Sequence, residues 1–139
     1  MISHSHKIKI YYKDIDQMGI VYYSRYFEFF ESARTELLNF IGIAVKDIEK
    51  NDIFLPVINA TCDYQKSAKF EDELTIISSI TEIPTARLKI NYKVLANDKS
   101  VLALGTTTHG FIDKTGKPKR PPLILKEKLI YLSNKSARG

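Results

Sequence analysis

The chain has 139 residues, 44% of them hydrophobic and 27% charged, which is ordinary for a soluble globular protein of one domain. No apolar run approaches the roughly 18 residues of a membrane-spanning helix, and the N-terminus lacks the apolar segment of a signal peptide. The single cysteine, Cys62, excludes an internal disulfide and favours a reducing compartment. We therefore expect a cytoplasmic protein, one domain over residues 1–139, with no membrane partner.

The net charge of +5 is concentrated near the C-terminus. From Asp113 onward eight Lys and Arg residues stand against two acids, a sum of +6, whereas the first 112 residues hold thirteen against fourteen, a sum of −1. This pattern indicates either a solvated chain end or an anionic partner, such as the phosphates of coenzyme A. Aromatic and basic residues do not interleave there as in single-strand-binding proteins, so no nucleic-acid partner is expected.

The first half of the chain predicts a strand followed by a long helix. Polar and apolar residues alternate over residues 7–12, which is typical of a strand with one buried face. His4 and His6 precede it, and we interpret them as disordered terminal residues rather than as a metal pair. Residues 22–41 follow a helical period with a wide, aromatic apolar face, which predicts an enclosed helix. Arg34 lies near the border of that face and is expected to pair with a carboxylate.

The second half predicts a short helical turn over residues 44–50 and then four strands. The strand segments are residues 54–64, 73–83, 87–94 and 101–112. The last two strands are predicted to pair as a hairpin, and residues 124–132 suit a short terminal helix. One sheet with one wide-faced helix predicts an α+β fold, in which a curled antiparallel sheet wraps around the long central helix.

Two carboxylates and a glycine lie at the junction between the first strand and the helix, as Asp14, Asp16 and Gly19. Their spacing matches the start of a calcium-binding loop, but Met18 and Arg25 occupy the fifth and twelfth positions, which excludes an EF-hand. Carboxylates at the mouth of a helix hold a general base or nucleophile beside free backbone N–H donors.

The start of the helix lacks an obvious capping residue. No Asp, Asn, Ser or Thr stands directly before Tyr22, which leaves the first N–H groups free for a ligand. Ser24, however, is available to cap a helix that begins later.

Several motifs together cover nearly the whole chain: Asp14-x-Asp16-x-x-Gly19-x-Val21-Tyr22-x-x-x-Tyr26, Ala33-Arg34-x-Glu36, Leu55-Pro56-Val57, Asp72-Glu73-Leu74, Gly105-x-x-x-His109-x-Phe111-Ile112-Asp113 and Gly116-Lys117-Pro118-x-Arg120-x-Pro122. In this combination the chain resembles the hot-dog-fold acyl-CoA thioesterases of the 4-hydroxybenzoyl-CoA thioesterase and YbgC-like group. That group usually has threonine where this chain has Ile15.

The resemblance implies that Asp16 acts as nucleophile or general base on a thioester, and that the N–H of Tyr23 donates to the oxyanion. A helix N-terminus, with unpaired N–H groups and a partial positive charge, suits that second role. Some members of the group have histidine at the position of Tyr23; tyrosine is no base at neutral pH, so Asp16 would act without a histidine neighbour. We interpret Asp14 as structural, and His109 as structural or lining the mouth of the site.

The expected substrate-binding residues are Tyr22, Tyr26, Pro56, Val57, Lys66 and Arg87. The tyrosines either wall an acyl pocket or belong to the core. The two basic residues, like Lys69, Lys117, Lys119 and Arg120, are candidates for the phosphates of coenzyme A or are simple surface charges. No metal or cofactor is expected beyond the coenzyme A of the substrate.

The sequence therefore predicts a thioester hydrolase that converts a small acyl- or aroyl-CoA into free acid and CoA. A homo-oligomer is expected, either a dimer or a dimer of dimers (a homotetramer), because subunit pairing covers exposed sheet edges. The alternatives are a thioesterase for acyl carrier protein, docked by the basic C-terminal segment, and a non-catalytic module that binds acyl thioesters or nucleic acid. The tyrosine cluster suggests an aromatic acyl group, such as hydroxybenzoyl or dihydroxynaphthoyl, as one candidate.

Overall fold

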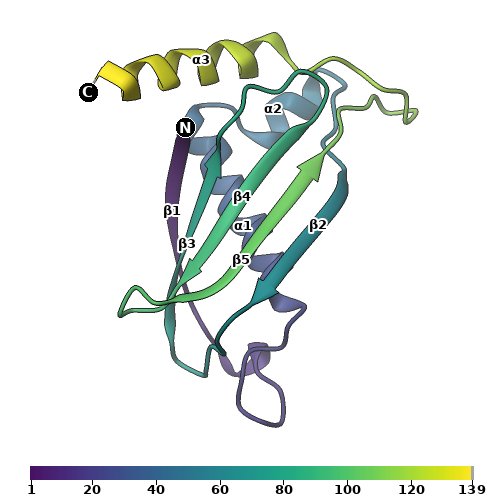
Figure 1. Ribbon diagram of the computed structural model, residues 1–139. Helices are drawn as coiled ribbons and strands as arrows, with labels where there is room; N and C mark the ends of the chain where they lie inside the picture. The colour runs from purple at the N-terminus through teal and green to yellow at the C-terminus, as the bar shows by residue number, and fades with distance from the viewer. Residues whose placement is uncertain (139) are drawn as a thin grey trace.

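The computed structural model describes residues 1–138 and shows one antiparallel sheet with a long helix along its face (Figure 1). The strands run in the order β1-β3-β4-β5-β2, so β1 and β2 are the edges. Their bounds are Ile2–Lys9 (β1), Val57–Tyr64 (β2), Glu73–Ile80 (β3), Leu88–Leu95 (β4) and Val101–His109 (β5). The helices are α1 (Arg25–Ile41), α2 (Val45–Lys50) and α3 (Leu123–Arg138), and a short 3-10 turn covers Tyr12–Asp14.

The core lies between α1 and the sheet. Alternate residues of β3 and β4 are buried, as expected for strands with one face covered by a helix. α1 contributes its apolar stripe, including Phe30 and Leu37, which have no exposed surface. Each such side chain stabilises the fold by about 1.5–3 kcal/mol relative to an exposed one. The predicted α+β arrangement, an antiparallel sheet around one long helix, is confirmed.

The N-terminal strand is longer than predicted. β1 pairs with β3 from Ile2 opposite Ile80 to Lys9 opposite Glu73, so the prediction of a disordered N-terminus was wrong. Both of its histidines lie in register with buried residues of β3, and the ring of His4 lies 5.1 Å from that of Phe40. The alternation of serine and histidine was thus a strand pattern in which histidine takes the inner positions.

The bounds of the remaining elements agree with the prediction within three residues, except at the end of α3. α1 begins at Arg25 rather than at Tyr22, and α3 continues to Arg138 rather than ending at residue 132. The predicted hairpin of the last two strands is confirmed, because β4 and β5 pair antiparallel around the turn after Leu95.

α3 lies across the end of the molecule opposite the loop that precedes α1 (Figure 1). It contacts β1 and α1, and its Leu125 and Leu129 are fully buried. Within residues 1–138, no helix combines the length and apolar character that crossing a bilayer requires.

Candidate active site

The segment between β1 and α1 folds into a narrow loop with Asp16 near its base. Ile15 and Val21 form an antiparallel bridge, and the N–H of Gly19 donates to the carbonyl of Asp16 at 3.0 Å. Gly19 has a φ of 80°, a left-handed conformation that side-chain-bearing residues adopt rarely. The N–H of Val21 donates to the carbonyl of Ala68, which holds the loop against the segment after β2.

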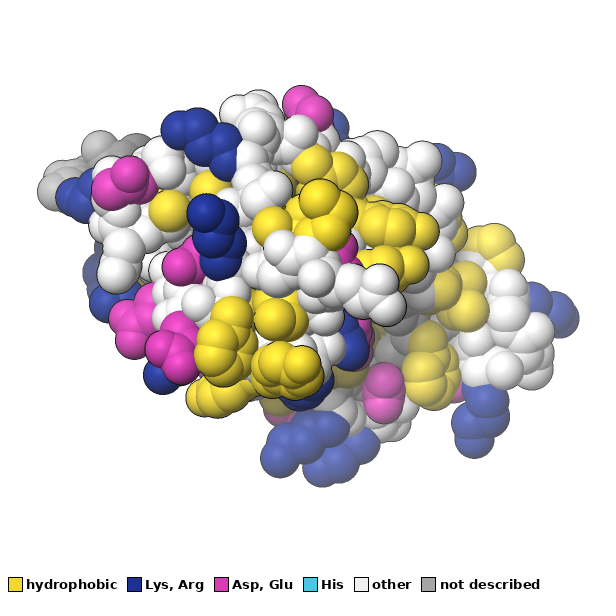
Figure 2. All heavy atoms as spheres, turned by 90° about the horizontal axis from the view of Figure 1, so that it is seen from below, with side chains coloured by type: hydrophobic (Ala, Val, Ile, Leu, Met, Phe, Trp, Pro, Cys, Tyr) yellow, Lys and Arg dark blue, Asp and Glu magenta, His cyan; other side chains and the backbone are white. Residues whose placement is uncertain are grey.

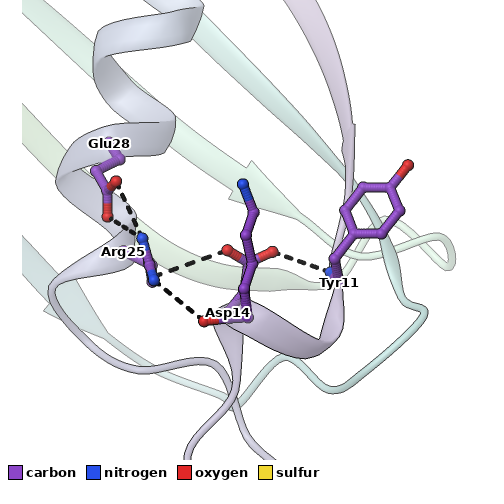
Figure 3. Close-up of polar contacts among 5 residues, drawn as sticks. Tyr11, Asp14, Arg25 and Glu28 are labelled. Carbon is purple, nitrogen blue, oxygen red and sulfur yellow. Dashed lines mark hydrogen bonds and ion pairs between the residues drawn. The ribbon is translucent and has the colours of Figure 1, made fainter.

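Asp14 is held in place by neighbours on both sides (Figure 3). One carboxylate oxygen accepts a hydrogen bond from the N–H of Tyr11 at 2.9 Å, and the other lies 3.8 Å from Nε of Arg25. Arg25 also donates to both carboxylate oxygens of Glu28 and to the carbonyl of Lys13. Asp14 is only 5% exposed, so its contacts fit the structural role that we expected for it.

Asp16 has a different environment. Its Oδ1 accepts the N–H of Met18 at 2.8 Å and, more weakly, that of Ile20 at 3.4 Å. Within the described part of the chain, the carboxylate forms no ion pair and Oδ2 accepts no hydrogen bond. The residue is half-buried. One oxygen is thus fixed by the loop, while the other remains available to a ligand.

The backbone donors before α1 are also unoccupied. Among residues 1–138, neither the N–H of Tyr23 nor that of Ser24 finds an acceptor, whereas the N–H of Tyr22 donates to the carbonyl of Asp14. Ser24 is the residue directly before α1, but its hydroxyl makes no capping bond. Two exposed residues with free N–H groups therefore precede the positive end of a 17-residue helix, on the same loop as Asp16.

A cavity of about 220 Å³ opens beside these donors. Its lining includes Tyr23, Tyr26, Tyr64 and Lys66, and the hydroxyl of Tyr64 donates to the carbonyl of Tyr23 at 2.8 Å. Tyr26 is 2% exposed and belongs to the core as well as to the cavity wall, whereas Tyr22 is exposed and outside the lining. Figure 2 views the molecule from the end at the bottom of Figure 1, where this loop lies, and shows hydrophobic side chains in several groups with Lys and Arg between them.

The phenols of Tyr26 and Tyr64 and the thiol of Cys62 are neutral at pH 7. Burial and the adjacent Cys62 side chain raise the pKa of both Tyr26 and Tyr64, and burial raises the pKa of the Cys62 thiol. A phenol with a raised pKa is not a base at neutral pH, and a protonated thiol is a poor nucleophile. Asp16 is therefore the better candidate for a reactive group at this end of the molecule.

Pro56, Val57 and Arg87 lie apart from this group. Val57 pairs with His109, which pairs with Leu88, so these residues are at the end of the sheet opposite the loop. The eight residues of β2 separate the two ends by roughly 25 Å. Within one chain, the predicted site residues therefore form two groups: Asp16, Tyr22, Tyr23, Tyr26 and Lys66 at one end, and Pro56, Val57 and Arg87 at the other.

The second end contains its own cavity of about 220 Å³, between α1, α2 and the sheet. Its lining includes Glu31, Arg34, Leu55 and His109. Arg34 is half-buried but forms no ion pair with any residue that the structure describes, contrary to our expectation. Burial raises the pKa of Tyr92, and the positive charge of Arg34 partly opposes that rise. For His109, burial is the main cause of a lowered pKa, and the charge of Arg34 adds to it.

A buried chain of hydrogen bonds fixes His109. The carbonyl of Leu55 lies 3.2 Å from Nδ1 and only accepts, so Nδ1 carries the hydrogen. Nε2 of the neutral ring then accepts from the hydroxyl of Thr107 at 2.9 Å, and the hydroxyl of Tyr92 donates to Thr107 at 2.7 Å. Burial lowers the pKa of His109, although the Leu55 carbonyl opposes this. These contacts fit the structural role that was one of our two interpretations of His109.

No group of three or more His, Cys, Asp or Glu side chains in residues 1–138 has the geometry to hold a metal ion.

The sheet around α1, with an aspartate loop before the helix, is the arrangement of the hot-dog thioesterases. The sequence profile of the Thioesterase-like superfamily matches residues 11–129, and the chain belongs to this superfamily. It is a thioester hydrolase of the hot-dog fold, as its motifs predicted.

Individual relatives agree with this assignment. The chain is 31% identical over 94 residues to the acyl-CoA thioesterase YbgC of Haemophilus influenzae, covering 67% of this chain and 69% of that one. It is 26% identical over 108 residues to the putative acyl-CoA thioesterase YneP of Bacillus subtilis, covering 78% of both. The solved DHNA-CoA thioesterase of Staphylococcus aureus superposes with a TM-score of 0.87 at 24% identity, covering 98% of this chain and 96% of that one.

Two residues near the aspartate loop escaped the sequence reasoning. Arg25 entered the sequence analysis only as the residue that excludes a calcium loop, although its spacing of three from Glu28 indicates an ion pair. No local pattern indicated a role for Tyr64, because its hydrogen bond to Tyr23 joins residues that are 41 apart in the chain.

Proposed function

We propose that the protein hydrolyses a small acyl- or aroyl-CoA to the free acid and CoA at the aspartate loop. The observation that carries this proposal is an Asp16 oxygen that has no partner among the described residues, on the same loop as two N–H groups before α1 that likewise find no acceptor there. The names of two relatives support the substrate class, since YbgC is an acyl-CoA thioesterase and YneP bears the same name as a putative one.

In the proposed reaction the thioester carbonyl accepts a hydrogen bond from the N–H of Tyr23. As the carbon becomes tetrahedral, negative charge moves onto that oxygen, and a preorganised donor stabilises it by about 3–4 kcal/mol. Asp16 either attacks the carbon, forming an anhydride that water then opens, or removes a proton from the attacking water. In both routes the C–S bond breaks, the sulfur leaves as the CoA thiolate, and one water is consumed.

The two separated groups of predicted site residues suggest that a second subunit completes the site. β2 is an edge strand, and seven of its eight residues are exposed. Antiparallel pairing of β2 with β2 of a second copy would place the second copy's Pro56–Val57 end beside Tyr64 and Tyr23 of this subunit. Pairing would also satisfy the unpaired backbone groups of both edges. We therefore propose that the active unit is at least a homodimer.

The same pairing would supply a pocket for the acyl group. The cavity lined by Leu55, Arg34 and His109 lies at the Pro56–Val57 end, so the second copy would bring its cavity toward this subunit's loop. The volume of about 220 Å³ suits a short acyl chain or a small aromatic ring system. An aromatic hydroxyl would find the side chains of Glu31 and Arg34 as polar partners there. Lys66 and Arg87 remain candidates for the coenzyme's phosphates.

The test is hydrolysis by the Asp16→Asn variant across a panel of short aliphatic and aromatic acyl-CoA thioesters. Loss of the carboxylate should lower kcat by about 10²–10⁴-fold while the circular dichroism spectrum is unchanged. Glu82→Gln, which neutralises an exposed carboxylate between β3 and β4, is the matched control and should retain parental rates. Undiminished turnover by Asp16→Asn would refute the assignment of this carboxylate.

Acyl carrier protein is a second candidate for the carrier of the acyl group, because the segment from Asp113 onward has a net charge of +6 and the carrier is acidic. Hydrolysis of one acyl group on both carriers, at low and high salt, separates the two, since attraction between exposed charges is screened by salt. A cytoplasmic location is part of the proposal, because both carriers belong to that compartment.

A further inference from the structure

α3 exposes apolar side chains on the side away from its buried stripe, and one of them, Ile124, also lines a cavity beside α2. Leu123 is 70% exposed, Ile124 52%, Ile130 48% and Tyr131 64%. At about 100° per residue, these four fall within one stripe on the helix, opposite the stripe of Leu125 and Leu129 that is buried. A helix with two apolar faces usually has both covered, so the outward stripe is a candidate contact surface.

Basic residues border this stripe on both sides. In the helical projection, Lys126 lies on one side of the stripe and Lys135 on the other, whereas the Nζ of Lys128 lies beside Gly42 at the end of α1. Glu127 falls within the stripe and is the only acid in the sequence of α3, so bases outnumber acids on this surface. The turn before α3 adds three more exposed bases, Lys117, Lys119 and Arg120.

The position of α3 leaves the stripe open in a dimer built through β2. α3 contacts β1 and α1, and β1 is the edge of the sheet farthest from β2. In Figure 1, α3 crosses one end of the molecule as its outermost layer. Edge-to-edge pairing of β2 therefore does not explain the exposed side chains of α3.

We propose that the outward stripe of α3 docks the protein on the surface of an anionic lipid bilayer. Leucine, isoleucine and tyrosine enter the boundary between headgroups and acyl chains, and the lysines at the stripe's borders reach the lipid phosphates. This contact lies on the bilayer and does not cross it, and it departs from our sequence-based expectation of no membrane partner. Two α3 helices packed stripe to stripe would bring basic borders together, so charge complementarity favours anionic lipid over a second copy.

Vesicle flotation tests this proposal with the full chain. The protein should float with phosphatidylcholine vesicles that contain phosphatidylglycerol at least about tenfold more than with pure phosphatidylcholine, and high salt should reduce the difference. The triple variant Leu123→Ser, Ile124→Ser and Tyr131→Ser should lose flotation. These side chains are exposed, so the thermal unfolding midpoint should change little. Flotation by the triple variant equal to that of the parent would overturn the proposal.

A tryptophan probe places the contact on the helix, because the chain has no tryptophan. The emission of Tyr131→Trp should shift to shorter wavelength with anionic vesicles and be quenched by brominated acyl chains. Tyr12→Trp, at a residue 78% exposed near the opposite end, is the matched control and should do neither. Equal responses from both probes, or none from Tyr131→Trp, would contradict docking through α3.

Two further outcomes also refute the proposal. Concentration-dependent assembly that the triple variant abolishes, without vesicle binding, would assign the stripe to a second copy of the chain. Binding to acyl carrier protein that the triple variant abolishes, again without vesicle binding, would assign it to an acidic protein. None of these readouts depends on thioester turnover, so a negative result would refute docking on a bilayer without bearing on the proposed function.

Discussion

The phenol of Tyr64, at the end of β2, donates a hydrogen bond to the backbone carbonyl of Tyr23 at 2.8 Å. Tyr23 is the first central residue of a turn that closes when the N–H of Arg25 reaches the carbonyl of Tyr22 at 2.9 Å. The edge strand is thereby tied directly to the turn that carries the free N–H groups. A change at the β2 edge is thus expected to affect the geometry of the proposed oxyanion donor.

Replacing Tyr23 with proline tests its backbone N–H. Proline is favoured at the first central position of such a turn, so Tyr23→Pro should keep the chain path and remove the donor. We expect kcat/KM for acyl-CoA to fall by about 10²–10³-fold. Tyr23→Ala removes the same side chain but keeps the N–H, and is therefore the matched control. Equal steady-state rates for the two variants would show that this N–H does not act on the oxyanion.

Charges placed on β2 test the proposed dimer. Ile58 and Ala60 are exposed on this edge strand, and lysine at both positions would place like charges close together in an antiparallel pair. We expect the double variant to sediment as a monomer and to lose thioesterase activity, because the site would lack its second half. Thr85→Lys, in an exposed loop, is the control. A monomeric variant with parental activity would contradict a site shared between subunits.

The sequence was most informative where one local pattern determined the structure. Alternation over residues 87–94 predicted β4 almost to the residue, because a one-residue slip would turn its buried side chains to solvent. The aspartate motif likewise located the loop before α1. Asp14 was expected to be structural, but its partner Arg25 was not predicted, since this contact depends on how the chain turns at residues 12–14.

Long-range pairing was less accessible from the sequence. β2 pairs with β5 rather than with its neighbour in sequence, and no local signal distinguishes these partners. The separation of Pro56 and Val57 from Asp16 follows from this pairing, because it sets the direction of β2. The two histidines of β1 were interpreted as disordered terminal residues, so a strand of eight residues was predicted two residues too short and shifted toward the loop.

Gly105 of β5 lies under the ring of Phe30, which suggests a test of core packing. A Cβ at this position would clash with two ring carbons of Phe30, a fully buried side chain stacked 4.3 Å from Tyr92. We expect Gly105→Ala to lower the free energy of unfolding by about 1–3 kcal/mol in urea titrations. At Gly110 the nearest atom to an added Cβ is 3.7 Å away, so Gly110→Ala should cost much less. Equal stability of the two variants would contradict this close packing.

The buried ring of His109 predicts how stability depends on pH. Its pKa is lowered in the folded protein, so below the unfolded value of about 6.5 the unfolded chain binds more protons than the native one. The free energy of unfolding should therefore fall as the pH is lowered from about 7 toward 5. The pKa values of Asp98 and Asp113 are lowered as well, but these two carboxylates affect stability only below about pH 4. Protonation would also break the bond in which Nε2 accepts from Thr107.

Urea titrations of His109→Gln across this pH range provide the measurement. The variant should be less stable than the parent at pH 7, because the hydrogen-bond chain to Leu55 and Thr107 is disturbed. Glutamine does not titrate, so the stability of the variant should also depend less on pH. His6→Gln removes another histidine, on β1, and should leave most of the slope in place. If His109→Gln kept the parental slope and His6→Gln lost it, the acid sensitivity would belong to β1. The buried chain from Tyr92 to Leu55 would then have no part in it.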